Sequence, residues 1–154
     1  MPILNNVAKA VAKPLPRIIS PKAHAVVDYM TVGSFFMAGA MFWSRSKRAA
    51  LSALFCGGAE LAVSLLTDYP GGVKRVISFP MHGKIDMGFA AMAATMPEFM
   101  AFEDEPETTF FRAQGVSITA VTSLTQFKGR SKDSGRDVEK DKNKEKKKRP
   151  ARAA

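Results

Sequence analysis

The sequence has little of what a disulfide-stabilised or thiolate-dependent protein requires. Its 154 residues include a single cysteine, Cys56, so the chain can form no internal disulfide and no site with several thiolate ligands. We interpret Cys56 as a small buried residue of an apolar helix. The sequence also lacks a glycine-rich phosphate-binding loop, a nucleophile elbow and a thiol pair. Because no such motif is present, we expect a protein without enzymatic activity.

The first residues do not show the pattern of a secretory signal peptide. Two lysines and two prolines interrupt the first apolar run, and no small-residue cleavage site closes it. We interpret residues 1–22 as a basic leader. Within it, residues 2–13 place Leu4, Val7 and Val11 at helical spacing, which fits an amphipathic helix on a membrane surface and equally fits a disordered segment.

Charge is concentrated at the end of the chain. Residues 128–154 hold 12 of the 23 Lys and Arg and 5 of the 14 Asp and Glu, which leaves residues 1–127 nearly neutral. We predict a disordered basic tail that contacts anionic lipid headgroups. Nucleic acid is a less favoured partner, because no aromatic residues alternate with the bases. The predicted headgroup contacts are Lys142, Lys144, Lys146, Lys147, Lys148 and Arg149.

Four long apolar stretches predict an all-α fold of four transmembrane helices over residues 23–127. The stretches cover residues 23–43, 49–66, 85–102 and 110–127. Each is close to the length of about 20 residues that crosses a hydrocarbon core about 30 Å thick. A soluble four-helix bundle would need a polar face on every helix, and residues 35–43 and 88–96 offer none. The pattern therefore favours a membrane protein.

The chain contains an internal repeat with an offset of 58 residues. The segments that begin at His24 and His82 both read His-x-x-x-Asp, and Leu66-Thr67 matches Leu124-Thr125 at the same offset. We interpret residues 23–68 and 82–127 as two helix hairpins. Because each unit contains two helices, both units enter the membrane from the same side, as a parallel repeat about an axis along the membrane normal.

The basic residues predict an inner-membrane protein with both termini in the cytoplasm. In that orientation 19 basic residues lie on the cytoplasmic side, while residues 103–107 supply four acids on the other side. The basic residues on that other side are Arg45, Lys47, Arg48 and Arg112.

Several segments resemble the SPW-repeat family of bacterial membrane proteins. They read HAVVDYMTVG, LLTDYPGGVKRVISFPMH, HGKIDMGFAAMAATMPEFMAF and SLTQF. The resemblance covers about residues 20–127 and is most specific in the Leu-Thr-Asp-Tyr link. Where that family has Ser-Pro-Trp, this sequence has Thr-Met-Pro-Glu at residues 95–98 and keeps only the proline. The resemblance implies the plan of two helix hairpins and a membrane location, and it implies no activity.

The ionisable residues within the apolar stretches form the candidate site. We expect five of them to share one layer near the cytoplasmic surface and to face the bundle, because a charge in lipid needs a partner. These residues are His24, Asp28, Glu60, His82 and Asp86. Each His and its Asp lie four residues apart, on one helix face.

Three interpretations of this layer stay open. The histidines and aspartates join the hairpins by hydrogen bonds, or His24 and His82 ligate a divalent metal or a haem. The third interpretation is a proton or solute pathway through Asp28, Asp86 and Glu60. We predict a polytopic membrane protein with a structural or interaction role, which forms a homo-oligomer or joins a larger membrane complex. The alternative is a small transporter or a metal- or haem-binding membrane protein.

Overall fold

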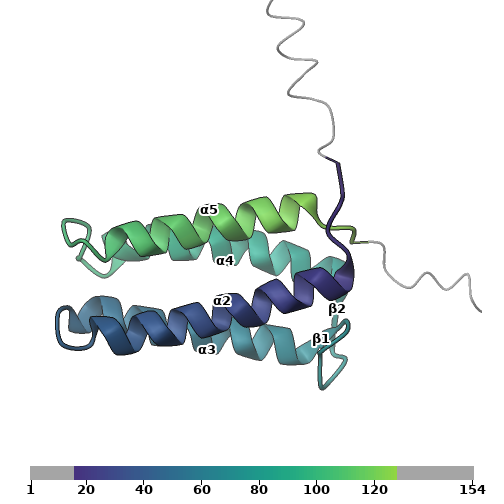
Figure 1. Ribbon diagram of the computed structural model, residues 1–154, viewed down its shortest axis with the longest axis horizontal. Coiled ribbons are helices and arrows are strands. Elements are labelled where there is room, and N and C mark those ends of the chain that lie inside the picture. The colour runs from purple at the N-terminus through teal and green to yellow at the C-terminus, as the bar shows by residue number, and fades with distance from the viewer. Residues whose placement is uncertain (1–15, 128–154) are drawn as a thin grey trace, which may run out of the picture.

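A computed structural model describes residues 16–127, which form four α-helices and one pair of very short strands (Figure 1). The elements are α2 (Pro21–Phe42), α3 (Lys47–Leu66), β1 (Thr67–Asp68), β2 (Ile77–Ser78), α4 (Phe79–Phe99) and α5 (Thr108–Leu124). The prediction of an all-α fold is therefore confirmed. The leader segment over residues 2–13, for which a helix and a disordered segment stayed open, lies outside the described residues. The predicted tail with its headgroup contacts lies outside them too.

Local sequence signals set the first turns of the helices. Ser20 and Ser46 accept hydrogen bonds from backbone N–H groups three residues later, at 3.2 and 3.1 Å, and so cap α2 and α3. Both α2 and α4 carry a proline in their first turn, where its missing N–H costs no helical hydrogen bond. The sequence therefore starts these helices independently of the apolar pattern.

Three predicted helix ends are wrong. Helix α4 ends at Phe99 rather than at residue 102. Helix α4 begins at Phe79 rather than at residue 85, because Ser78 and Pro80 start a helix whose first turns are too polar to count as an apolar stretch. Helix α5 ends at Leu124 rather than at residue 127. Thr125 has φ −86° and ψ 142°, an extended conformation that ends the helix although the sequence stays partly apolar.

The helices pack as two neighbouring pairs, α2 with α3 and α4 with α5 (Figure 1). The loops within the pairs, residues 43–46 and 100–107, lie at one end of the bundle. The strands β1 and β2 lie at the other end, together with both ends of the described chain. The helices consequently run up, down, up and down.

Short backbone pairings join the helix pairs at the strand end. Thr67 pairs with Ile77 in the parallel β1–β2 ladder, and Thr125 pairs with Ile19 in a parallel bridge. The Ile19 N–H donates to the Leu124 carbonyl at 3.0 Å, and the Ile19 carbonyl accepts from the next residue after Thr125, also at 3.0 Å. Both pairings involve positions related by the 58-residue offset.

All four helices contribute to the apolar core. The Phe35 ring of α2 makes edge-to-face contacts with Phe89 of α4 and Phe110 of α5, at centroid distances of 5.9 and 5.4 Å. Cys56 is fully buried in α3, as its apolar surroundings in the sequence predict. The same core holds the two helix pairs together over much of their length.

Many large apolar side chains point away from this core. Helices α2 and α3 contain stretches with a mean hydropathy of 1.4 and 1.8, of which only 33% and 44% is buried. Within residues 16–127, these two helices are long and apolar enough to cross a membrane, and α4 and α5 fall short of the same measure. The exposed apolar side chains include Val26, Met30, Met37, Met41, Leu51, Phe55, Met87 and Val116.

Candidate functional site

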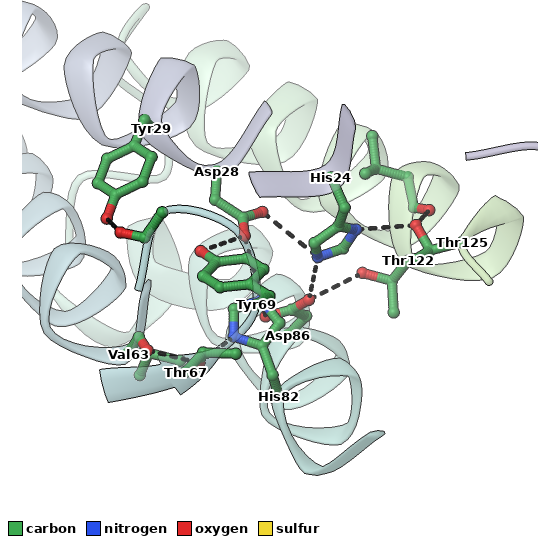
Figure 2. Close-up of polar contacts among 12 residues, drawn as sticks. His24, Asp28, Tyr29, Val63, Thr67, Tyr69, His82, Asp86, Thr122 and Thr125 are labelled. Carbon is green, nitrogen blue, oxygen red and sulfur yellow. Dashed lines mark hydrogen bonds and ion pairs between the residues drawn. The ribbon is translucent and has the colours of Figure 1, made fainter. Parts of the chain in front are cut away.

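The two His-x-x-x-Asp segments meet between α2 and α4, near the strand end of the bundle (Figure 2). We call His24, Asp28, His82 and Asp86 the His/Asp cluster. All four side chains are buried, with residue exposures of 1%, 5%, 0% and 2%. The structure thus brings together four of the five ionisable residues that the sequence places in one layer.

The Nε2 atom of each imidazole faces both carboxylates. His24 Nε2 lies 3.1 Å from an oxygen of Asp86 and 3.4 Å from an oxygen of Asp28. His82 Nε2 lies 3.2 Å from the other oxygen of each aspartate. Imidazoles and carboxylates therefore alternate around a closed ring, which has one contact within each helix and two contacts between α2 and α4.

Threonine side chains contact Nδ1 of each histidine, the ring nitrogen that faces away from the carboxylates. His24 Nδ1 lies 2.8 Å from Thr125 Oγ1, and His82 Nδ1 lies 2.9 Å from Thr67 Oγ1. Thr125 is the C-cap of α5, in the second hairpin, and contacts His24 of the first hairpin. Thr67 is the C-cap of α3, in the first hairpin, and contacts His82 of the second. The caps thereby connect the neighbouring helices to the His/Asp cluster.

The threonine contacts fix which ring nitrogen carries hydrogen. Each hydroxyl donates to the carbonyl four residues earlier, Val63 for Thr67 and Val121 for Thr125, at 2.7 Å. A hydroxyl has one hydrogen, so the threonine oxygen must accept from the imidazole. Both histidines consequently carry a proton on Nδ1.

The aspartates differ in their further donors. The Tyr69 hydroxyl donates to Asp28 at 2.9 Å, and the Thr122 hydroxyl donates to Asp86 at 3.4 Å. Phe127 stands 58 residues after Tyr69 and has no hydroxyl. Burial raises the pKa of Tyr69 well above its ordinary value, so its hydroxyl stays a neutral donor.

Glu60 lies beside the His/Asp cluster, as its position in the sequence predicts. Its residue exposure is 4%, and ligand atoms of Glu60, Asp28 and His82 lie within 4.8 Å of one another. Glu60 also lines a cavity of about 20 Å³ together with Asp28 and Asp86. That space is sufficient for one water-sized particle. Ile118 holds the corresponding position in α5, so this third carboxyl group occurs on one side only.

Two buried atoms of the cluster lack a hydrogen-bond partner. Among residues 16–127, His82 Nε2 and Asp86 Oδ1 make none, because their 3.2 Å contact does not have hydrogen-bond geometry. Leaving such groups unsatisfied in a protein interior costs about 1–3 kcal/mol each. The arrangement therefore suits electrostatic attraction or a shared cation better than a fully hydrogen-bonded network.

The geometry does not fit a haem between the histidines. The imidazole rings of His24 and His82 meet edge to face with centroids 5.3 Å apart. Both Nε2 atoms face the two carboxylates, which occupy the space that a planar macrocycle would need. A small cation and direct ion pairs are the chemical options that the side chains leave.

The sequence alone did not reveal the second layer of this site. Thr67 and Thr125 marked the repeat, yet their contact with the histidines depends on how each helix ends. Tyr69 lies in the connecting segment, where the sequence fits a plain loop and an interfacial segment equally well. The 58-residue offset was the available signal, since it relates Thr67 to Thr125 as it relates His24 to His82.

Comparisons with protein families, with curated protein sequences and with solved structures find no match for this chain. The resemblance to SPW-repeat proteins accordingly stays a prediction that depends on the segments quoted above.

Proposed function

We propose that this chain is a polytopic inner-membrane protein with a structural or interaction role, in which two duplicated helix hairpins are joined by the His/Asp cluster. All four helices cross the membrane, and both termini lie in the cytoplasm. The observation that carries the proposal is the apolar outer surface of α2 and α3, most of which is unburied. A soluble bundle would direct polar side chains outward at these positions.

The charges at the two ends of the bundle support this orientation. Outside the His/Asp cluster and Glu60, the strand end has five basic residues and one acid among residues 16–127, whereas the loop end has four basic residues and five acids. Positive charge is retained on the cytoplasmic side of membrane proteins. The strand end therefore faces the cytoplasm.

The basic residues at the loop end are largely engaged with the protein. Arg45 lies 3.2 Å from Glu107, Arg112 lies 2.6 Å from Glu98, and Arg48 donates to the Ala101 carbonyl at 2.6 Å. Basic residues outside the cytoplasm count against this orientation, and they count less when their charges contact groups of the protein itself. The contacts of Arg45 and Arg48 also join the first hairpin to the loop of the second.

Proposed partners follow from the same orientation. The tail over residues 128–154 extends the basic cytoplasmic side and contacts anionic headgroups or an acidic protein partner. A homo-oligomer or a larger membrane complex accounts for an interaction role without catalysis.

Cell fractionation tests the proposal. We expect the full-length chain to stay in the membrane pellet after an alkaline carbonate wash and to enter solution only with detergent. A peripheral protein released by carbonate serves as the control. Recovery of the monodisperse chain in the aqueous fraction without detergent would contradict the proposal.

A further inference from the structure

The proton positions in the His/Asp cluster raise the question of what lies between its inner atoms. Because Nδ1 of His82 donates to Thr67, a neutral His82 presents the lone pair of Nε2 to the centre of the cluster. His24 Nε2 lies within hydrogen-bond distance of Asp86, at 3.1 Å. Oxygens of Asp28 and Asp86 face the same centre. Lone pairs and anionic oxygens repel one another, so the arrangement calls for positive charge among them.

The contact between each histidine and its threonine is the outer contact typical of metal sites. A metal-ligating histidine almost always donates its other ring N–H to an oxygen, which fixes the tautomer and orients the ring. Here Thr67 and Thr125 perform this function for both histidines, and each threonine is itself fixed by a bond to a helix carbonyl. The two imidazoles are therefore oriented before any cation binds.

The unpartnered atoms point to the same place. His82 is fully buried, and its Nε2 lies between oxygens of both aspartates without a hydrogen bond within residues 16–127. Glu60 and the adjoining cavity of about 20 Å³ add a further carboxyl group and space for one small particle. If the His/Asp cluster only joined the helices by ion pairs, it would need neither the third carboxyl group nor the cavity.

Distances and charge agree with a divalent transition metal. The four nitrogen–oxygen separations are 3.1–3.4 Å, close to the edge of about 3.3 Å in a tetrahedral zinc site with bonds of about 2.0 Å. Ligand atoms of His24, His82 and Asp86 all lie within 4.8 Å of one another. Two aspartates neutralise one divalent ion. Mixed imidazole and carboxylate donors suit first-row transition metals better than Mg²⁺ or Ca²⁺, which prefer oxygen ligands alone.

We propose that the His/Asp cluster binds one divalent first-row transition-metal ion through Nε2 of His24 and His82 and a carboxylate oxygen of Asp86, with Asp28 and Glu60 beside the ion. Thr67 and Thr125 are positioning residues for the two imidazoles. The bound ion links α2 to α4, so the site extends the structural role proposed above. It does not depend on where in the cell the protein lies.

Cobalt binding tests this proposal directly. The full-length chain, purified in mild detergent with a histidine-free affinity tag and stripped with chelator, is titrated with Co²⁺ and then with Zn²⁺. We expect ligand-field absorption that saturates at one Co²⁺ per chain and disappears when Zn²⁺ displaces the cobalt. Elemental analysis of the unstripped protein should show close to one metal ion per chain.

Variants separate ligands from positioning residues. The double substitution His24→Gln with His82→Gln should abolish the cobalt spectrum. Thr125→Val keeps every ligand, and we expect it to weaken Zn²⁺ binding about 10- to 100-fold, with recovery in Thr125→Ser. Thr119→Val is the matched control, because that hydroxyl also donates to the carbonyl four residues earlier but lies away from the cluster.

The wild-type titration decides the question even if a variant fails to fold. Absence of a saturable cobalt spectrum in the helical wild-type chain, or an unchanged spectrum in the double histidine variant, would overturn the proposal. A chain recovered without detergent would contradict the membrane proposal alone, because the same titration can then be performed in buffer.

Discussion

At the scale of single residues, the site is built from equivalent positions that are not identical. Offsets of 58 residues relate the histidines, the aspartates and the capping threonines. The equivalence fails at Tyr69, whose counterpart is Phe127. Asp28 therefore receives a phenolic hydrogen bond that Asp86 lacks, and the two carboxylates have different surroundings.

We expect Tyr69→Phe to lower the free energy of unfolding by about 1–3 kcal/mol, because Asp28 would lose a buried donor. Thermal unfolding in mild detergent, followed by circular dichroism, measures the change. Tyr29→Phe is the control, since its hydroxyl bonds to the Gly71 carbonyl near the surface and should matter less. Equal losses in both variants would show that the contact with Asp28 has no special weight.

The sequence predicted the cluster residues better than their partners. Periodicity and the repeat place His24, Asp28, His82 and Asp86 on facing surfaces, because spacing of four residues fixes a helix face. The threonine contacts depend on where α3 and α5 end, and a helix end is set by local backbone geometry that apolar patterns do not record. Contacts between residues more than 60 positions apart also require knowledge of the packing.

At the scale of helices, close approach within each pair depends on glycine. Gly115 in α5 faces the Ala90 carbonyl and the Ala94 side chain of α4, and a Cβ added there would lie 2.7 Å from each. The neighbouring atoms belong to backbone or to a side chain that cannot rotate away. Helix α5 can therefore sit this close to α4 only because position 115 lacks a side chain.

We expect Gly115→Ala to destabilise the protein by about 1–3 kcal/mol, since α4 and α5 would have to separate. Gly88→Ala in α4 is the matched control. No atom outside its own helix lies within 4 Å of its added Cβ, so the better helix propensity of alanine should leave stability unchanged or raise it by up to about 1 kcal/mol. Unfolding in detergent compares the two, and destabilisation by both would contradict the packing argument.

The helices themselves were largely predictable. The stretches over residues 23–43 and 49–66 agree with α2 and α3 to within a few residues, because their apolar runs are long and follow serine N-caps. The early start of α4 could not be found from hydropathy, since its first turns contain His82 and Lys84. Capping signals at Ser78 and Pro80 describe that start better than the apolar pattern does.

At the scale of the whole molecule, the distribution of charge between the ends predicts the orientation in the membrane. In a Cys56→Ala background, we expect Ser44→Cys at the loop end to react with a membrane-impermeant maleimide in intact spheroplasts. Val73→Cys at the strand end should react only after the membrane is permeabilised. Both positions are exposed, so unequal labelling reports sidedness. Reaction of both from one side would exclude the proposed topology.

The bridge between Ile19 and Thr125 brings the described chain back to the point where it began. The two ends of the described chain therefore lie side by side. The Ile19–Thr125 pairing between these ends has the same form as the Thr67–Ile77 pairing, where the chain runs on from one hairpin to the next. The order of the two halves along the gene is then immaterial to the contacts they make. Two separately translated halves, or a chain permuted to begin in the 70–72 turn, would find the same neighbours, and two copies could exchange halves without losing any of these contacts.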